Sequence, residues 1–339
     1  MNHCHRRGFG SLALGLALAA SVSGPATVPP AFLFEWGSEG TAAGKFNHPW
    51  GVATDATGNV YVAEATGARI QKFTPYGRYM TEWGSYGSGS GQFISPMAVA
   101  VDAAGAVFVS CTGTHRIQKF DSDGAFITEW GSYGTGDREF DQPQGLAFDK
   151  SGNVYVADTL NHRIQKFDND GAFITKWGSF GTGNYELSFP LGLAVDSSGI
   201  VHVAEYGNHR IHLFDGTGTH MGMWGSFGSG QGKFSNPADV AIDADGTIYV
   251  AEVGNSRIQM FDGPATYVGE WGSEGTGEGE FDEPRALAIH PSQRVYVTDP
   301  YNHRVQAFGD PCLELFIGES VGPSRTLQLG AFPPLTTPR

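Results

Sequence analysis

The sequence predicts an all-β protein, a six-bladed β-propeller of four-stranded antiparallel blades. The first observation is a 47-residue repeat, in which a Trp-Gly-Ser triplet, a proline and an arginine each return at that interval. The second is that each repeat holds four short runs of Val, Ile, Phe and Tyr, separated by Asp, Asn and Gly. One such sheet alone buries neither apolar face, whereas six sheets stacked around an axis bury both. The repeating tryptophans are Trp36, Trp83, Trp130, Trp177, Trp224 and Trp271.

The third repeat shows the expected order of strands within a blade. Its four strands, a to d, are predicted at residues 146–149, 153–157, 163–167 and 172–177. The a–b and c–d turns open with Asp149 and Asp168 and contain Gly152 and Gly171, which suits tight hairpins. We place strand a at the central channel and strand d at the rim. The b–c turns and the long d–a loops then share one face, called the top face below.

The two ends of the repeat predict how the ring closes. In the sixth repeat, residues 313–317 stand where the outer strand belongs, but Gly318 replaces the tryptophan. Residues 32–40, upstream of the first repeat, form a complete outer strand without inner partners. We therefore expect the N-terminal strand to complete the sixth blade and close the ring. The propeller is assigned to residues 31–318, and residues 319–339 to a proline-rich C-terminal tail.

Residues 1–30 do not match the repeat and are typical of an export signal. Basic residues at 5–7 are followed by an apolar run at 12–20 and then by small residues and prolines. We expect a periplasmic or extracellular protein, and Arg6-Arg7 leaves both the general and the twin-arginine export routes open. No stretch is long and apolar enough to span a membrane as a helix. We expect a monomer.

Charge and cysteine content narrow the function. The chain has 35 acidic and 21 basic residues and a net charge of −14, which disfavours nucleic-acid binding because that relies on Lys and Arg at phosphates. Of three cysteines, Cys4 lies in the leader, and Cys111 and Cys312 are expected to be two separate thiols. The sequence predicts no cofactor.

Repeated polar residues have structural interpretations. In five repeats an acid ends strand b, five residues before the repeating arginine, and we expect the two to pair across the b–c turn. In the second repeat Cys111 takes the place of the acid, which would leave Arg116 free. Histidines precede this arginine in four repeats, at equivalent positions that fan apart around the axis, so no metal site is predicted there. These histidines are His115, His162, His209 and His303. The Asp-x-Asp-Gly stretches 121–124 and 243–246 lack the glutamate that completes a calcium loop and are interpreted as hairpin turns.

The repeat resembles a known family. Val156-Ala157-Asp158, followed by 161–167 with the sequence NHRIQKF and by Gly171, is similar to the NHL repeat, and the resemblance spans residues 32–308. It implies a six-bladed propeller, in a family that includes RNA-binding domains, extracellular sensor domains and a few lyases. The peptidylglycine-amidating lyases of that family place zinc-binding histidines directly after the proline that opens strand a. Here no repeat has histidine at that position, and His48 precedes its proline.

The positions that follow the opening proline differ from one repeat to the next. Because the repeats otherwise share one framework, these differences mark where a ligand would be recognised, at the mouth of the channel. The candidate ligand-binding residues are Trp50, Met97, Gln144, Leu191, Asp239 and Arg285. No catalytic residues or metal ligands are assigned. The first hypothesis is a binding module for a protein, peptide or glycan on the top face. The alternative is a propeller enzyme, a lyase or lactone hydrolase, with its site at the channel mouth.

Overall fold

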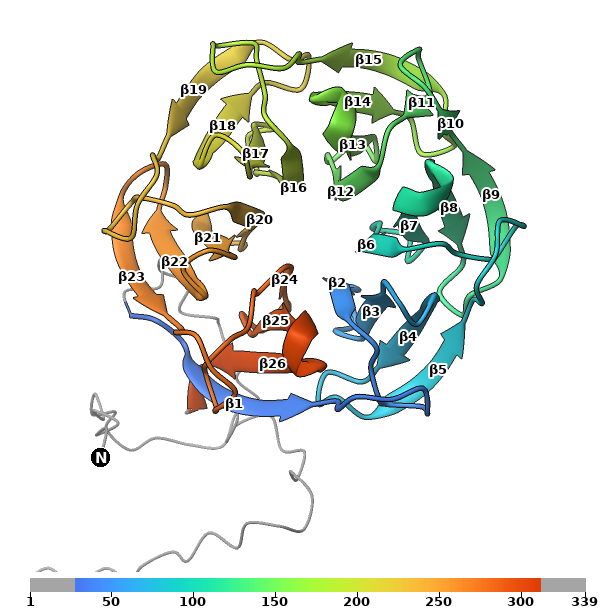
Figure 1. Ribbon diagram of the computed structural model, residues 1–339, viewed down its shortest axis with the longest axis vertical. Helices are drawn as coiled ribbons and strands as arrows, with labels where there is room; N and C mark the ends of the chain where they lie inside the picture. The colour runs from blue at the N-terminus through green and yellow to red at the C-terminus, as the bar shows by residue number, and fades with distance from the viewer. Residues whose placement is uncertain (1–27, 312–339) are drawn as a thin grey trace, which may run out of the picture. The chain divides into compact units, whose positions relative to one another are not determined.

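The computed structural model describes residues 28–311, which form six four-stranded antiparallel sheets that follow one another around a central channel (Figure 1). The first blade contains β2 (Pro49–Thr54), β3 (Val60–Glu64), β4 (Arg69–Phe73) and β5 (Tyr79–Trp83). The second contains β6 (Pro96–Val101), β7 (Val107–Cys111), β8 (Arg116–Phe120) and β9 (Phe126–Trp130). The third contains β12 (Pro143–Phe148), β13 (Val154–Asp158), β14 (Arg163–Phe167) and β15 (Phe173–Trp177).

The second half of the ring repeats the plan. The fourth blade contains β16 (Pro190–Val195), β17 (Val201–Glu205), β18 (Arg210–Phe214) and β19 (His220–Trp224). The fifth contains β20 (Pro237–Ile242), β21 (Thr247–Glu252), β22 (Arg257–Asp262) and β23 (Tyr267–Trp271). The sixth contains β24 (Leu287–Ile289), β25 (Val295–Asp299), β26 (Arg304–Gly309) and β1 (Ala31–Trp36). Short elements in the loops are η1 (Thr112–Thr114), η2 (Thr159–Asn161), η3 (Pro300–Asn302), β10 (Ser132–Tyr133) and β11 (Glu139–Phe140).

The predicted six-bladed fold is confirmed, and in the third blade strands b and d differ from their predicted bounds by one residue while strand a differs by three at its start. Strand a of the third blade begins at Pro143 rather than at residue 146, because Pro143 already pairs with Asp158 before a bulge that ends at Leu146. The same early pairing opens the first, second, fourth and fifth blades. Within residues 28–311 no helix is long and apolar enough to cross a membrane.

The predicted hairpin turns form by a common local mechanism. In the third blade, Oδ1 of Asp149 accepts the backbone N–H groups of Ser151 and Asn153, both at 2.9 Å. Gly152 then adopts a φ of 82°, which a residue with a Cβ enters at a steric cost. This pattern, Asp followed three residues later by Gly, therefore ends strand a and turns the chain back into strand b within four residues.

The ring is closed by the N-terminal strand, as predicted. β1 pairs antiparallel with β26 and forms the rim of the sixth blade, where Phe32 contacts Phe308 with 6.0 Å between ring centroids. Trp36 packs between this blade and the first, with its ring centroid 5.7 Å from that of Tyr296 and 5.8 Å from that of Phe73. Residues 313–317, the other segment considered for this position, lie outside the described residues.

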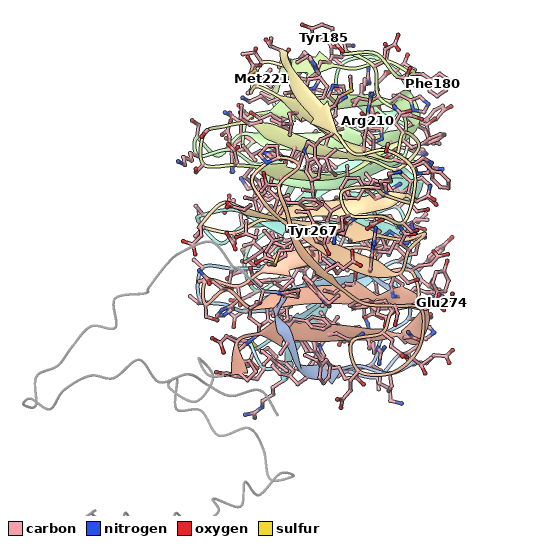
Figure 2. All side chains as sticks on the ribbon, turned by 90° about the vertical axis from the view of Figure 1, so that its left-hand side faces the viewer. Phe180, Tyr185, Arg210, Met221, Tyr267 and Glu274 are labelled. Carbon is pink, nitrogen blue, oxygen red and sulfur yellow. The ribbon has the colours of Figure 1, made fainter. Side chains whose placement is uncertain are left out.

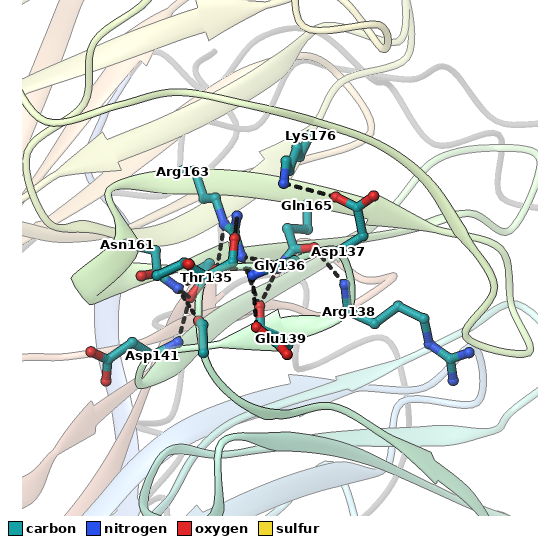
Figure 3. Close-up of polar contacts among 12 residues, drawn as sticks. Thr135, Gly136, Asp137, Arg138, Glu139, Asp141, Asn161, Arg163, Gln165 and Lys176 are labelled. Carbon is teal, nitrogen blue, oxygen red and sulfur yellow. Dashed lines mark hydrogen bonds and ion pairs between the residues drawn. The ribbon is translucent and has the colours of Figure 1, made fainter.

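A buried arginine in each of five blades joins a hairpin to the loop that enters it, and Figure 3 shows the one in the third blade, Arg163. In the third blade, Nε of Arg163 donates to the fully buried Asp158 at 2.6 Å. The same guanidinium donates to the backbone carbonyls of Thr135, Gly136 and Glu139 at 2.5–2.8 Å. The expected acid–arginine pairs are confirmed, and the structure adds that each arginine also holds three carbonyls of the preceding d–a loop.

The second blade keeps its arginine without the acid. Arg116 still donates to the carbonyls of Ser88, Gly89 and Gln92 at 2.6–3.1 Å, so the expectation that it would be free is wrong. Because Cys111 stands in place of the acid, the buried Nε of Arg116 has no hydrogen-bond partner. Cys111 cannot serve as the missing anion, because burial raises the pKa of its thiol to about 11.

We expect removal of β1 to destabilise the propeller severely. A chain that begins at residue 39 lacks the partly buried Phe32, Phe34 and Trp36, whose combined loss should cost at least as much as the loss of one fully buried aromatic side chain, about 3–5 kcal/mol. Its urea midpoint should therefore fall well below that of a control chain that begins at residue 28. Equal midpoints for the two chains would show that β1 does not close the ring.

We expect Cys111→Asp to stabilise the second blade. The new carboxylate would accept the unpaired Nε of Arg116 as Asp158 accepts that of Arg163, and satisfying a buried donor is worth about 1–2 kcal/mol. Chemical denaturation at pH 7 measures the gain. The control Cys111→Ser, which adds no charge, should not show it, and an equal gain in both variants would contradict the prediction.

Candidate functional site

The six inner strands enclose a cavity of about 360 Å³ along the axis of the ring. It is lined by β2, β6, β12, β16, β20 and β24 together with the residues that precede β24. All six predicted site residues line this one cavity, and they are Trp50, Met97, Gln144, Leu191, Asp239 and Arg285. Trp50, Met97, Gln144 and Leu191 are partly exposed there, as the position after each opening proline predicts. Whether they bind a ligand stays a prediction.

Glycine keeps the inner strands close together. A Cβ on Gly145 would lie 2.0 Å from the carbonyl oxygen of Leu191 in the next blade, and one on Gly51 would lie 2.7 Å from that of Met97. Real Cβ atoms do not approach backbone oxygens so closely, so a larger residue would force neighbouring inner strands apart. In the first, third and fourth blades the close approach of the inner strands therefore depends on the glycine two positions after the proline, which is Gly51, Gly145 or Gly192.

Trp50 and Arg285 meet across the seam between the first and sixth blades. The guanidinium carbon of Arg285 lies 4.5 Å from the centroid of the Trp50 ring, which is the geometry of a cation–π contact. Nη2 of Arg285 is paired with Glu283, and its Nε has no hydrogen-bond partner. Thr298 donates to the carbonyl of Trp50 at 2.9 Å and so ties the two blades together at this point. The stacked pair is a preformed, partly exposed aromatic and cationic surface.

Asp239 has a different role from the one expected for a ligand-binding acid. Its Oδ2 accepts the backbone N–H of Leu287 at 2.8 Å, and its Oδ1 accepts the N–H of Val240 at 2.9 Å. The first bond joins β20 to the start of β24, so the side chain bridges the fifth and sixth blades. Burial raises the pKa of Asp239 to about 7, because the two backbone donors only partly replace lost hydration.

The four histidines that precede the repeating arginine are structural in the described chain. Nδ1 of His115, His162 and His209 each accepts a backbone N–H of the next d–a loop, at 3.0–3.1 Å. The corresponding bond of His303, to His48, is 3.4 Å long. Among residues 28–311, no group of three or more His, Cys, Asp or Glu side chains is placed to hold a metal ion.

Two features of the structure were not found from the sequence. Nε2 of the buried His212 lies 2.9 Å from Nδ1 of His220, and Nδ1 of His212 lies 2.8 Å from Oε1 of Glu205, a chain of polar contacts within the fourth blade. The second is a row of exposed aromatic rings on the top face, at Tyr86, Tyr133, Phe180 and Phe227. The sequence does mark this row of rings, because the residue after each Trp-Gly-Ser triplet is aromatic in four repeats and glutamate in two.

Comparison with known proteins identifies the repeat and the fold. The family model described as NHL repeat matches residues 46–73, 140–167, 187–214, 234–261 and 281–308. A streptogramin B lyase structure has a TM-score of 0.58 and 15% identity, over 81% of this chain and 97% of that one. A protein of unknown function from Bacteroides thetaiotaomicron has a TM-score of 0.60 and 15% identity, over 81% and 76%.

A third similar structure carries a bound compound. It is a catalytically inactive histidine-to-alanine variant of virginiamycin B lyase from Staphylococcus aureus with quinupristin, with a TM-score of 0.54 and 15% identity, over 78% of this chain and 85% of that one. No curated protein matches the chain. At such identities the three structures show a shared fold.

The raised pKa of Asp239 predicts how stability changes with pH. In the unfolded chain this carboxyl ionises near its ordinary pKa of 3.8, whereas in the fold it stays protonated up to about pH 7. Between these values ionisation favours the unfolded chain, so the contribution of Asp239 to stability falls as the pH rises from about 4 to 7. The free energy of unfolding of Asp239→Asn, measured in urea, should therefore rise relative to that of the wild type over this range.

The exposed Asp170 supplies a matched control for this measurement. Its side chain is 90% exposed and lies 3.5 Å from the ammonium of Lys119, and Asp170→Asn controls for the general effect of replacing a carboxyl group by an amide. A difference between wild type and Asp239→Asn that stays constant from pH 4 to 8 would contradict the raised pKa.

Proposed function

Since the chain is a six-bladed NHL-repeat β-propeller, we propose that it is a binding module whose ligand enters the channel mouth on the top face. The observation that carries the proposal is the stack of Arg285 on Trp50 at the edge of the cavity of about 360 Å³. Pockets of this size are typical of specific small-ligand or side-chain recognition. The ligand we infer is a segment of a protein, peptide or glycan, received by a protein that residues 1–30 direct out of the cytoplasm.

Each part of the mouth has a role in this proposal. Trp50 offers a large, rigid apolar surface whose burial costs little side-chain entropy. Arg285, held in place by its contacts with Trp50 and Glu283, supplies the positive charge that orients a polar group. Met97 and Leu191 add apolar contact, and Gln144 adds an amide that can both donate and accept. Asp239 has a structural role at the site, because its two oxygens accept the backbone N–H groups of Leu287 and Val240.

The enzymatic alternative draws on the lyases that share the fold. The Staphylococcus aureus lyase is inactive when one histidine is replaced by alanine. The described residues that line this cavity include no histidine or cysteine, and their one carboxylate, that of Asp239, is occupied by backbone donors. General acid–base chemistry needs a titrating side chain whose oxygen or nitrogen is free to contact the substrate, and both oxygens of Asp239 already accept backbone N–H groups. We therefore favour binding over catalysis.

We expect Trp50→Ala and Arg285→Ala each to weaken ligand capture by about 1–2 kcal/mol, or 5- to 30-fold. Arrays of random peptides and of oligosaccharides identify ligands of the wild type, and titration of the best of them measures the loss. Thermal melting should change little, because neither residue belongs to the repeated framework. Asp123→Ala, on the face of the tight turns and 86% exposed, serves as the control and should bind as the wild type does.

Two outcomes would contradict this proposal. The site would be elsewhere if Asp123→Ala abolished binding while the Trp50 and Arg285 variants bound normally. Conversion of quinupristin by the purified protein, followed by mass spectrometry, would instead support the enzymatic alternative.

A further inference from the structure

Four aromatic rings project from equivalent positions on the top face, away from the channel. Tyr86, Tyr133, Phe180 and Phe227, here called the aromatic arc, each stand three residues after a repeating tryptophan, in four consecutive d–a loops. They are 68–75% exposed. Figure 2 shows Phe180 on the same side of the propeller as Glu274, which holds the equivalent position after the fifth blade. A single exposed apolar side chain is ordinary, but four rings at equivalent positions on one face offer a repeated apolar contact to a partner that spans several loops.

The rings of the aromatic arc are held in place before any partner arrives. On either side of Phe180, the carbonyl of Ser179 accepts the N–H of Leu187 at 2.7 Å, and the N–H of Gly181 donates to the carbonyl of Leu187 at 3.2 Å. Leu187 is fully buried, so the loop is anchored in the core directly beneath the exposed ring. Binding to a preordered surface loses less conformational entropy than binding to a mobile one.

Histidine side chains pack against three of the four rings. His115, His162 and His209 contact Tyr133, Phe180 and Phe227, with ring centroids 4.8–4.9 Å apart. Each imidazole is itself fixed by the backbone N–H that its Nδ1 accepts. Burial lowers the pKa of His162 and of His209, which keeps these two rings neutral at neutral pH. The arc therefore presents aromatic surface without a cationic backing at these two positions.

The composition of the loops points to a protein partner. Loops 84–93 and 178–183, with sequences GSYGSGSGQF and GSFGTG, combine an exposed aromatic ring with Gly, Ser and Thr. Protein-binding loops use this combination, because rigid aromatic side chains give contact area and small polar residues give adaptable hydrogen bonds.

Charge indicates which kind of protein would bind. Where the arc ends, the equivalent positions hold Glu274 and Glu39. Loop 272–283 adds Glu278, Glu280, Asp282 and Glu283 and contains no Lys or Arg. The whole chain carries −14, so an anionic partner is repelled and a cationic one attracted over long range. Lys and Arg side chains also bind favourably over the faces of Tyr and Phe.

We propose that the aromatic arc and loop 272–283 together dock a protein that presents Lys or Arg side chains interspersed with apolar ones. The aromatic rings receive the apolar and cationic side chains, and the acidic loop pairs with the remaining positive charge. This surface is separate from the channel mouth, and its function does not depend on a ligand binding there.

The test uses the full chain and a defined probe, a ten-residue peptide of alternating Lys and Leu with a fluorescent label. Its dissociation constant is measured by anisotropy for wild type and for the double variant Tyr133→Ser/Phe180→Ser. The matched control is Ile127→Ser/Ile174→Ser, which removes two apolar side chains that are 50% and 48% exposed on the rim strands β9 and β15. Neither pair of substitutions changes the net charge, so differences between them report the aromatic rings.

The expected result is binding by the wild type, a loss of at least tenfold in the arc variant, and a change below twofold in the rim variant. A ligand identified for the channel mouth should not displace this labelled peptide, so a failure here and a failure of the channel site can be told apart. The proposal is overturned if the wild type does not bind, if both pairs of substitutions weaken binding alike, or if a Glu–Leu peptide binds as well. It is also overturned if the arc variant loses affinity for cellohexaose, a neutral glycan, while its affinity for the Lys–Leu peptide is unchanged.

Discussion

The structure depends on one buried polar contact that recurs in each blade, the arginine that opens strand c. By donating to three carbonyls of the incoming d–a loop, it satisfies backbone groups that would otherwise be buried without partners. In five blades the Nε of this arginine donates to a buried acid, which balances its charge. In the second blade the hydrogen bonds to the carbonyls persist without that acid. The hydrogen bonds to the carbonyls therefore fix the geometry of the loop. The buried acid offsets the cost of burying the charge of the arginine.

A framework held this way leaves particular positions free to vary. The residue after each opening proline faces the channel, and the residue three positions after each tryptophan faces solvent on the top face. Neither takes part in the arginine contacts, so both can change without loss of the fold. The inner set forms a small mixed cavity and the outer set an aromatic row, two surfaces at different distances from the axis.

Most of the fold could be predicted from the spacing of Trp36 and its counterparts, because a strict repeat allows each strand to be checked six times. The placement of Trp50 and Arg285 at the channel also followed from register, whereas their direct contact did not, because Arg285 was expected opposite Trp50 and lies over its ring. The role of Asp239 could not be predicted, since it depends on β24 starting only at Leu287, which leaves that backbone N–H in need of an acceptor. The aromatic arc was missed because exposure is a property of the folded loop, and the sequence around Phe180 does not distinguish a core ring from a surface one.

Closure of the ring by β1 has a consequence for how the protein is made. The strand that emerges first from the ribosome pairs with β26, which is among the last parts of the propeller to be synthesised. Until residues 304–309 are available, Phe32 and Trp36 have no blade to complete, and the growing chain carries an unpaired edge at each end. The native ring therefore closes only after β26 has been synthesised, and a chain truncated before β26 would expose strand edges that can pair with other chains.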